Sequence, residues 1–411
     1  MKDYRYIGKS LSNDSAYEKV TGRTVYCSDM ESTQMLHIKC KPSEVAHGII
    51  KKIDTSRAEA LEGVRAVYTY LNTPDTYYDR GRVSAYEAPH SANQERLFDA
   101  HVRFYGERVA AVVAETPEIA QRGCDLIDVE YEVLPAAITM EDALAEGAPL
   151  VHEEGNAYPT EMGWGDYERA KGDRIFTSQV ETGRMTHMCM ETQCARARYE
   201  CGKLTIWVGT QTVYGVRSTV ADFLGMPYSK VRVVKTVMGG SFGAKQEMMV
   251  EPLTAFAARD LEADVKLVYT REEQIVNTML KHNLISKVES KVDADGTIQG
   301  IRVHTDMEAG AYLTITPSYL RTMGGKLGKV YDFHNIRFTG RTVCTHTPVN
   351  GSFRSWGSSE ATVTVETHLN KVARELGMDP IEFRLKNVLK PGSRDVMHGA
   401  TIGEIHFAEA L

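Results

Sequence analysis

Strand-like and helix-like segments alternate along this chain, and that alternation limits its possible folds more than any other feature. Residues 108–115 form an apolar run of strand length. Thr116-Pro-Glu118 then supplies the N-cap, first-position proline and first-turn acid of a helix that we expect to reach about Leu126. Residues 128–133 alternate polar and apolar side chains at period two, as a half-buried strand does. The pattern predicts a β-α-β unit in an N-terminal domain of mixed α/β type.

The segment from 136 to 180 is rich in glycine, proline and acids, and we interpret it as the connection to a second domain. Pro252 requires the helix around it to kink or to start late, and Asp379-Pro-Ile-Glu382 opens a helix as a capping box. Hairpins among alternating strands and helices favour an α+β fold with mixed sheets. The other expected elements are a strand at 203–208, a helix at 213–224, a strand at 231–237, a hairpin at 284–306 and a helix closed by Gly377.

The composition excludes several classes of protein. The chain has 411 residues, with 48 Lys and Arg against 55 Asp and Glu, so its net charge of −7 is not suited to neutralising a nucleic-acid backbone. No stretch approaches the roughly 18 apolar residues of a membrane helix, and the start is too polar for a secretory signal, so we expect a cytoplasmic location. Seven cysteines without a C-x-x-C pair argue against disulfides, a zinc ribbon or a ferredoxin-type cluster in this chain.

The first candidate site is the loop Met238-Gly-Gly-Ser-Phe-Gly-Ala-Lys245, which directly follows an apolar strand. Its glycines can expose backbone N–H groups to a phosphate or to another anionic group of a cofactor. It is not a P-loop, because Ala244 separates Gly243 from Lys245, and it is not a G-x-G-x-x-G loop. A tight strand-to-helix turn without a ligand is the alternative interpretation.

Two further segments carry candidate residues. In Asn350–Glu360, Arg354 could pair with an anion and Trp356 could present a flat face to a planar ligand, or Trp356 could be purely structural. On a strand, His187, Cys189 and Glu191 would share one side and form a metal face. Three mixed ligands on one strand rarely converge on one ion, so we favour a buried polar pair of His187 and Glu191 that positions neighbouring loops.

Short segments in a common order extend over nearly the whole chain. They are Ile7-Gly8, Lys19–Asp29, Gly106–Thr116, Tyr131–Pro135, His187 with Glu191, Thr210-Gln211, Gly239–Gly243, Glu308–Tyr312, Phe353-Arg354, and Asp379–Arg384 with Asn387. In this order and spacing they resemble the molybdenum-binding subunit of the xanthine dehydrogenase family of molybdenum hydroxylases. Each segment alone is a weak signal, but together they form a specific match.

The resemblance implies an α+β fold in which an N-terminal α/β hammerhead-like domain precedes the first part of a molybdenum-cofactor-binding domain with mixed sheets. We expect the hammerhead-like domain over residues 1–140. Two molybdopterin-binding subdomains are expected over residues 141–285 and 286–411.

The resemblance also implies a molybdopterin cofactor, with the cytosine dinucleotide form expected, whose dithiolene holds molybdenum. The protein then supplies few or no metal ligands, and none is expected here. Carried over by position, Gln211 hydrogen-bonds the oxo ligand of the metal and Arg354 binds close to the pterin or the metal, so these two are the expected catalytic residues. The expected cofactor-binding residues are Gly240, Ser241, Phe242 and Gly243, together with Arg354.

The same comparison implies three substrate-binding residues. Trp356 stands where the purine enzymes of the family stack a phenylalanine on the substrate, and Arg321 aligns with a substrate-orienting arginine after a one-residue gap. Gln246 stands where the purine enzymes carry a glutamate, and a neutral amide cannot exchange a proton as that acid does. Ser241, Ala244 and Ser355 replace glycines of the family pattern. Serines surround Arg354 where the carbon-monoxide-oxidising branch has a cysteine, which argues against that branch.

The implied reaction is hydroxylation of an electron-poor ring carbon, with water as the oxygen source. The family's base glutamate lies in a later Gly-Val-Gly-Glu type segment that this chain lacks. We therefore expect a heteromer with a second molybdopterin-binding subunit, an iron–sulfur [2Fe-2S] subunit and an FAD subunit; a truncated chain is the rival explanation. Xanthine or hypoxanthine is the first substrate hypothesis and nicotinate or another pyridine carboxylate the second. A non-catalytic paralogue or assembly factor with the same fold is a further alternative.

Overall fold

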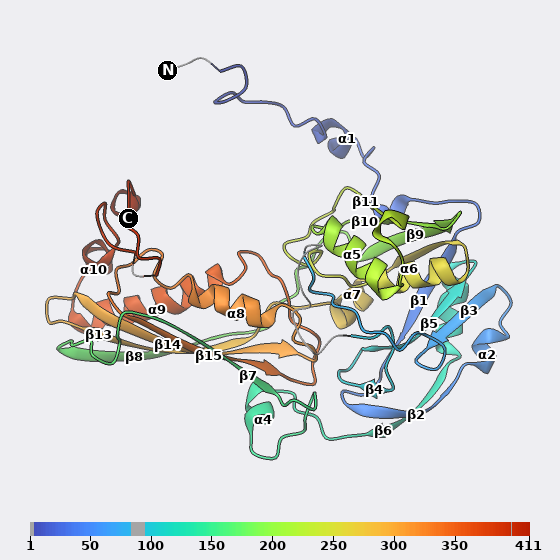
Figure 1. Ribbon diagram of the computed structural model, residues 1–411, viewed down its shortest axis with the longest axis horizontal. Coiled ribbons are helices and arrows are strands. Elements are labelled where there is room, and N and C mark those ends of the chain that lie inside the picture. Colours follow the sequence, from blue (N-terminus) through green and yellow to red (C-terminus); the bar gives the residue numbers. More distant parts are fainter. Residues whose placement is uncertain (1–3, 84–94, 396) are drawn as a thin grey trace.

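The computed structural model describes residues 4–83, 95–395 and 397–411, and it has two lobes that each contain a large β-sheet (Figure 1). The strands are β1 (Leu36–Pro42), β2 (Gly48–Asp54), β3 (Val64–Thr69), β4 (His101–Val102), β5 (Arg108–Ala114), β6 (Asp128–Val133), β7 (Ala157–Trp164), β8 (Arg174–Thr182), β9 (Cys194–Glu200), β10 (Lys203–Val208), β11 (Val231–Lys235), β12 (Asp264–Val268), β13 (Leu284–Val292), β14 (Ile298–Gly310) and β15 (Ile336–Cys344). The helices are α1 (Ala16–Val20), α2 (Ser56–Glu59), α3 (Pro117–Asp125), α4 (Met140–Leu144), α5 (Val213–Phe223), α6 (Glu251–Asp260), α7 (Arg271–Asn277), α8 (Thr316–Gly324), α9 (Ser358–Leu376), α10 (Pro380–Asn387) and α11 (Phe407–Ala410). The expected α+β fold with mixed sheets is confirmed.

The first lobe is built on a seven-stranded sheet in the order β11-β10-β9-β12-β1-β5-β3. The pairs β1/β12 and β10/β11 are parallel, whereas β9 pairs antiparallel with both β10 and β12. The strand β5 is buried on both faces, since Ala111 and Val113 belong to the core that includes α5 and α6, and Ala110 and Val112 pack with Cys124 of α3. This sheet joins strands from before and after residue 140, and the expected domain boundaries at 140 and 285 stay predictions.

The expected β-α-β unit forms its three elements but not its expected pairing. Thr116 caps α3 by accepting a hydrogen bond from the Ile119 N–H at 3.2 Å, as its sequence predicts. However, β6 pairs with β2 in a separate three-stranded sheet, ordered β4-β2-β6, instead of entering the sheet of β5. The continuous apolar run of β5 fits an inner strand, whereas the charged, largely exposed β6 fits a sheet edge. The helix α3 therefore links two sheets.

The prediction of a mere connection over 136–180 is wrong. Thr139 and Asp142 form a capping box at the start of α4, and the segment then contributes β7 and β8. These are the two edge strands of the five-stranded sheet β7-β15-β14-β13-β8 of the second lobe. Pro159 and Gly163 made β7 look like a loop, but an edge strand tolerates a proline because one side of its backbone needs no partner.

The second lobe follows its local sequence signals closely. The hairpin of β13 and β14 turns at Asp293–Gly296, where the Gly296 N–H donates to the Asp293 oxygen at 2.9 Å. The helices α8 and α9 lie along one face of the sheet (Figure 1). Gly377 ends α9 with a φ of 71°, and Asp379 caps α10 through the N–H groups of Ile381 and Glu382. In the first lobe, Pro252 lies in the first turn of α6, which starts late as expected.

The N-terminal residues from 4 to about 25 extend away from both lobes (Figure 1). Within the residues that the structure describes, no helix is long and apolar enough to cross a bilayer.

Candidate functional site

Three loops that are distant in the sequence meet between the two lobes. One is the loop at 238–245, which follows β11; the second is the segment at 350–357, which precedes α9; the third is the segment at 187–193, which precedes β9. A Cβ atom on Gly243 would lie 2.3 Å from the Ser352 oxygen, so the first two loops are in direct backbone contact. His187 Nε2 lies 2.7 Å from that same oxygen. The expected cofactor loop and the Arg354 segment are therefore neighbours.

The backbone of the 238–245 loop leaves several N–H groups without a hydrogen-bond partner among the described residues. Gly240, Phe242 and Gly243 have positive φ values of 101°, 54° and 110°. The four consecutive N–H groups of residues 240–243 donate no hydrogen bond to any residue of the described chain. A run of unbonded N–H groups in such a conformation forms a nest for an anion. The loop thus has the donor set that the sequence suggested, and the tight turn without a ligand explains it less well.

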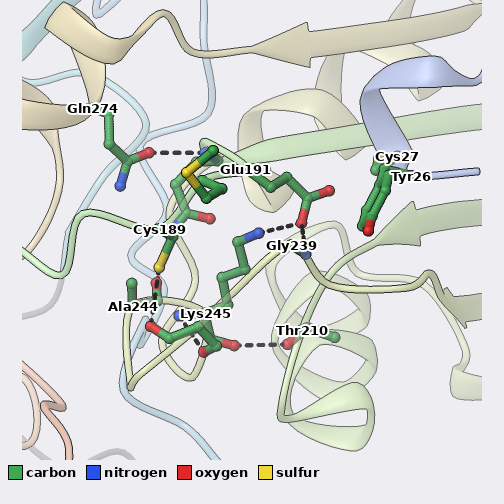
Figure 2. Close-up of polar contacts among 12 residues, drawn as sticks. Tyr26, Cys27, Cys189, Glu191, Thr210, Gly239, Ala244, Lys245 and Gln274 are labelled. Carbon is green, nitrogen blue, oxygen red and sulfur yellow. Dashed lines mark hydrogen bonds and ion pairs between the residues drawn. The ribbon is translucent and has the colours of Figure 1, made fainter. Parts of the chain in front are cut away.

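A buried ion pair holds the two ends of this loop together (Figure 2). Glu191 Oε2 accepts hydrogen bonds from the Gly239 N–H at 2.8 Å and from Lys245 Nζ. Cys189 Sγ also donates to the Ser241 oxygen at 3.2 Å. Glu191 therefore ties Gly239 and Lys245, the two ends of the loop, to one buried carboxylate.

The expected polar pair of His187 and Glu191 is therefore wrong. Glu191 binds Lys245, whereas His187 contacts the Ser352 oxygen and packs on the Phe353 ring at 4.7 Å between centroids. Burial lowers the pKa of His187 below its usual value. The two side chains still position neighbouring loops, but each positions a different one. The alternative of a metal face also fails, since no group of three His, Cys, Asp or Glu residues within the described ranges could hold a metal ion.

Gln211 lies against the loop, as expected of a residue in the same site. Its backbone N–H donates to the Lys245 oxygen at 2.8 Å, and its Oε1 accepts a hydrogen bond from the Ser241 hydroxyl. Gln246 is half-buried next to it, and its backbone oxygen accepts from Thr212 Oγ1 at 2.6 Å. The structure thus brings Gln211, Gln246 and the loop together.

Arg354 and Trp356 lie on a strained turn directly before α9. Ser355, Trp356 and Gly357 have consecutive positive φ values of 73°, 42° and 83°. Such conformations cost roughly 1–3 kcal/mol for each non-glycine residue and cluster at functional sites. Arg354 is exposed on this turn. It is therefore available to an anionic ligand.

Trp356 is half-buried, and its ring packs 6.4 Å from that of Tyr319 on α8. Gly357 contacts the same helix, because a Cβ atom there would lie 3.0 Å from the Met323 N. Arg321 is exposed on α8. The expected substrate residues Trp356 and Arg321 thus belong to two elements that are in contact. The buried part of the Trp356 side chain packs against the core of the second lobe.

Glu247 is a site residue that the sequence interpretation missed. It is buried, and its Oε1 accepts a hydrogen bond from the Ser352 N–H at 2.7 Å. Glu247 therefore joins the segment directly after the 238–245 loop to the segment at 350–357. Burial raises the pKa of Glu247 to about 7. The available signal was an acid directly before the apolar run Met248-Met-Val250.

The residues present fit a large anionic cofactor. The open N–H groups of residues 240–243 suit oxygen-rich groups, and Gly243 has no room for a side chain. Comparison with known proteins identifies that cofactor. A family model described as the molybdopterin cofactor-binding domain matches residues 151–388, and one described as the aldehyde oxidase and xanthine dehydrogenase a/b hammerhead domain matches residues 21–135.

The large molybdopterin subunit of nicotinate dehydrogenase from Eubacterium barkeri is 32% identical over 397 residues, which cover 96% of this chain and 92% of that one. The chain belongs to the xanthine dehydrogenase family of molybdenum hydroxylases. It is a molybdopterin-binding subunit of this family.

Other relatives in the molybdenum hydroxylase family are longer. The molybdenum-binding subunit of xanthine dehydrogenase from Escherichia coli is 32% identical over 403 residues, which cover 96% of this chain and 54% of that one. The solved aldehyde oxidoreductase of Desulfovibrio gigas superposes with a TM-score of 0.87 at 27% identity, covering 96% of this chain and 45% of that one. The chain thus spans about half the length of these two relatives.

Proposed function

We propose that this molybdenum hydroxylase subunit serves a heteromeric enzyme that hydroxylates an aromatic N-heterocycle, xanthine or hypoxanthine, with water as the oxygen source. The observation that carries the proposal is the open row of N–H groups at residues 240–243 beside Gln211 and within the same site as Arg354. When bound, the cofactor would supply the redox-active metal that takes up the two electrons released as water hydroxylates the ring.

The residues of this chain then bind and orient. The N–H groups of residues 240–243 donate to oxygen atoms of the cofactor, as an oxyanion hole does. Gln211, whose Oε1 already accepts from Ser241, has its Nε2 left to donate a hydrogen bond into the site. Arg354 supplies a permanent positive charge, and its planar guanidinium suits a phosphate or an oxo group.

Substrate contacts fall to Trp356, Arg321 and Gln246. The exposed part of the Trp356 ring offers a flat apolar surface to a heteroaromatic ring. Arg321 attracts a carbonyl or carboxylate oxygen of the substrate. Gln246 donates and accepts hydrogen bonds but transfers no proton.

We further propose the molybdopterin cytosine dinucleotide form of the cofactor. The proposed partners are a second molybdopterin-binding subunit that carries the base glutamate, an iron–sulfur subunit with [2Fe-2S] clusters, and an FAD subunit. Support comes from the near-complete coverage of a relative that is itself named a large molybdopterin subunit. The cytoplasmic location expected from the sequence stays a prediction.

A second candidate substrate is nicotinate or another pyridine carboxylate. The same relative favours it, because its name is that of a nicotinate dehydrogenase. Gln246 favours it as well, since the glutamate of the purine enzymes is missing. Arg354 or Arg321 would then bind the carboxylate group.

The test is purification of the native complex, followed by molybdenum analysis and a panel of xanthine, hypoxanthine and nicotinate. We expect molybdenum to be present, and turnover to be lost in Arg354→Ala and Gln211→Ala at unchanged thermal stability. Arg374→Ala, an exposed arginine on α9, is the matched control and should retain turnover. A native complex without molybdenum would instead support a non-catalytic paralogue or assembly factor.

A further inference from the structure

Residues 4–25 form an N-terminal arm whose large apolar side chains are exposed. Every residue from 4 to 23 except Ser15 is exposed. The large apolar side chains of the arm are between 48% and 82% exposed. They are Tyr4, Tyr6, Ile7, Leu11, Tyr17, Val20 and Val25. Isolated exposed apolar residues are ordinary, but such a concentration on one short segment marks an interaction site.

The arm contributes little to the fold of the chain. The Arg23 N–H donates to the Glu18 oxygen at 2.8 Å, and Thr21 Oγ1 donates to the Tyr17 oxygen at 2.7 Å, both within the arm. The first buried residue is Cys27, which lies on the seven-stranded lobe and donates from its Sγ to the Trp207 oxygen. Changes within the arm should therefore leave the lobes folded.

The arm is attached at the edge of the candidate site. Tyr26 forms a parallel bridge with Val237, two residues before Gly239. Tyr26, Glu191 and Gly239 also line one pocket of about 350 Å³, and Figure 2 shows Tyr26 and Cys27 on the far side of the Glu191 carboxylate from Lys245. Glu191 Oε1 is buried there without a hydrogen-bond partner among the described residues.

Large apolar side chains are also exposed on the loops of the candidate site. Val237, Phe242 and Met188 are exposed on its two loops, and Met190 is 90% exposed beside the pocket. Phe242 and Met188 also have positive φ values, so these large side chains are held outward by a strained backbone. A partner that covers the site would meet the arm as well.

We infer that the arm is a docking segment that binds the second molybdopterin-binding subunit. The inference rests on the proposed heteromer and adds the surface that holds it together. In the longer relatives the half of the polypeptide that this chain does not match is covalently joined to the matching half. In a split enzyme non-covalent contacts hold the two halves together, and the arm is attached at the edge of the site that both halves would share.

The N-terminal arm carries a net positive charge. From residue 4 to 25 the arm has four basic residues (Arg5, Lys9, Lys19, Arg23) and two acidic ones (Asp14, Glu18), which gives 4 − 2 = +2, whereas the whole chain has a net charge of −7. We therefore expect the surface of the partner that meets the arm to be apolar and acidic. Since the charge attraction is screened by salt, the apolar contacts carry the affinity and the charges speed association.

The experiment uses the full chain, tagged at its C-terminus, in the native complex. The test variant combines Ile7→Asp, Leu11→Asp and Val20→Asp. The matched control combines Leu71→Asp and Val133→Asp, which are equally apolar, each 68% exposed, and distant from the arm in the fold. We measure the amount of each subunit recovered with the tagged chain and the thermal midpoint of each isolated variant.

We expect the test variant to recover at least tenfold less of the second molybdopterin-binding subunit, at an unchanged thermal midpoint, while the control recovers it fully. Full recovery with the test variant would overturn the inference. Loss of only the iron–sulfur subunit, or of only a second copy of this chain, would also overturn it and would name the true occupant. A wild-type complex without a second molybdopterin-binding subunit would refute the proposed heteromer itself.

Discussion

The Ser241 hydroxyl donates a hydrogen bond to Oε1 of Gln211 and accepts one from the Lys245 N–H at 3.2 Å. An amide whose oxygen is engaged in this way turns its Nε2 donor to the opposite side. Ser241 therefore determines which end of the Gln211 amide is left free to donate a hydrogen bond. A glycine at this position has no side chain to impose that orientation.

Replacing Ser241 should consequently weaken catalysis without preventing cofactor binding. We expect Ser241→Ala to lower kcat about fivefold, the effect of one neutral hydrogen bond, with KM nearly unchanged. Ser241→Thr retains the hydroxyl and should restore most of kcat. Steady-state kinetics of complexes with equal molybdenum content provide the measurement. Equal kcat values for Ser241→Ala and the wild type would show that Gln211 needs no such support.

Gly243 is the point where the two main loops touch, so a side chain there should separate them. Its φ of 110° is unfavourable for any other residue, and an added Cβ would lie 2.3 Å from the Ser352 oxygen. We expect Gly243→Ala to destabilise the chain by about 3 kcal/mol or more and to lower its molybdenum content.

Gly377→Ala is the control for backbone strain alone, since Gly377 has a φ of 71° and open space around it. It should cost only about 1 kcal/mol. Denaturant unfolding of both variants checks the difference. Similar losses for the two variants would mean that contact between the loops is unimportant.

Glu247 should make the free energy of unfolding fall as pH rises. Burial raises the pKa of Glu247 to about 7, so the folded state holds a proton that the unfolded state releases near its ordinary pKa of 4.5. Between these values the unfolded state binds fewer protons, so this residue makes the free energy of unfolding fall as pH rises. Its contribution is lost completely above about pH 7.

Glu247→Gln removes this titration and retains an oxygen that can accept from the Ser352 N–H. We expect the variant to gain stability relative to the wild type between pH 5 and pH 8, by up to about 3 kcal/mol. Glu272→Gln, at an exposed position on α7, serves as the control and should show no such gain. Thermal unfolding across this pH range would refute the idea if the two variants behaved alike.

Acid should loosen the junction between the three-stranded sheet and the second lobe. His47 and His101 bond through their Nε2 atoms at 2.9 Å, and the His47 ring packs 3.9 Å from that of His346. Burial lowers the pKa of His346 to about 3 and that of His101 to about 4. Unfolded histidines take up protons near pH 6.5, so their stabilisation is complete above that pH and is lost as pH falls towards these values.

We expect His346→Asn to flatten the acid side of the stability curve, by up to about 1 kcal/mol per pH unit between pH 6 and pH 4. Its oxygen can still accept the hydrogen bond that the Ala137 N–H donates to His346 Nδ1 at 3.1 Å. The variant should be less stable at pH 7, since it loses the ring packing on His47. An unaltered slope in His346→Asn would exclude this cluster as the source.

Elements with local signals could be predicted from the sequence. Thr116, Asp379 and Gly377 cap their helices in place, because capping depends on a few adjacent residues. Sheet pairing could not be predicted in this way, since β6 pairs with β2 across about 80 residues and not with its neighbour β5. The edge strands β7 and β8 were missed because edges need fewer apolar residues than central strands.

The site residues also divide into those that could be predicted from the sequence and those that depend on contacts between distant residues. The loop at 239–243, Gln211 and Arg354 could be named from the resemblance, and the structure places Gln211 against the loop. The partner of Glu191 could not be foreseen, because Lys245 lies 54 positions away and only the folded chain brings them together. The roles assigned to the individual site residues stay predictions.

The seven-stranded sheet bears on how this chain and its relatives can vary. The hammerhead match ends at residue 135, yet Leu36–Ile38 of β1 pair with Val265–Leu267 of β12, which lies within the other match. A chimera that took residues 21–135 from one relative and the remainder from another would place foreign strands side by side in one hydrogen-bonded sheet. The two matched segments are therefore not separate folding units, and substitutions in β1 and β12 should covary across the family.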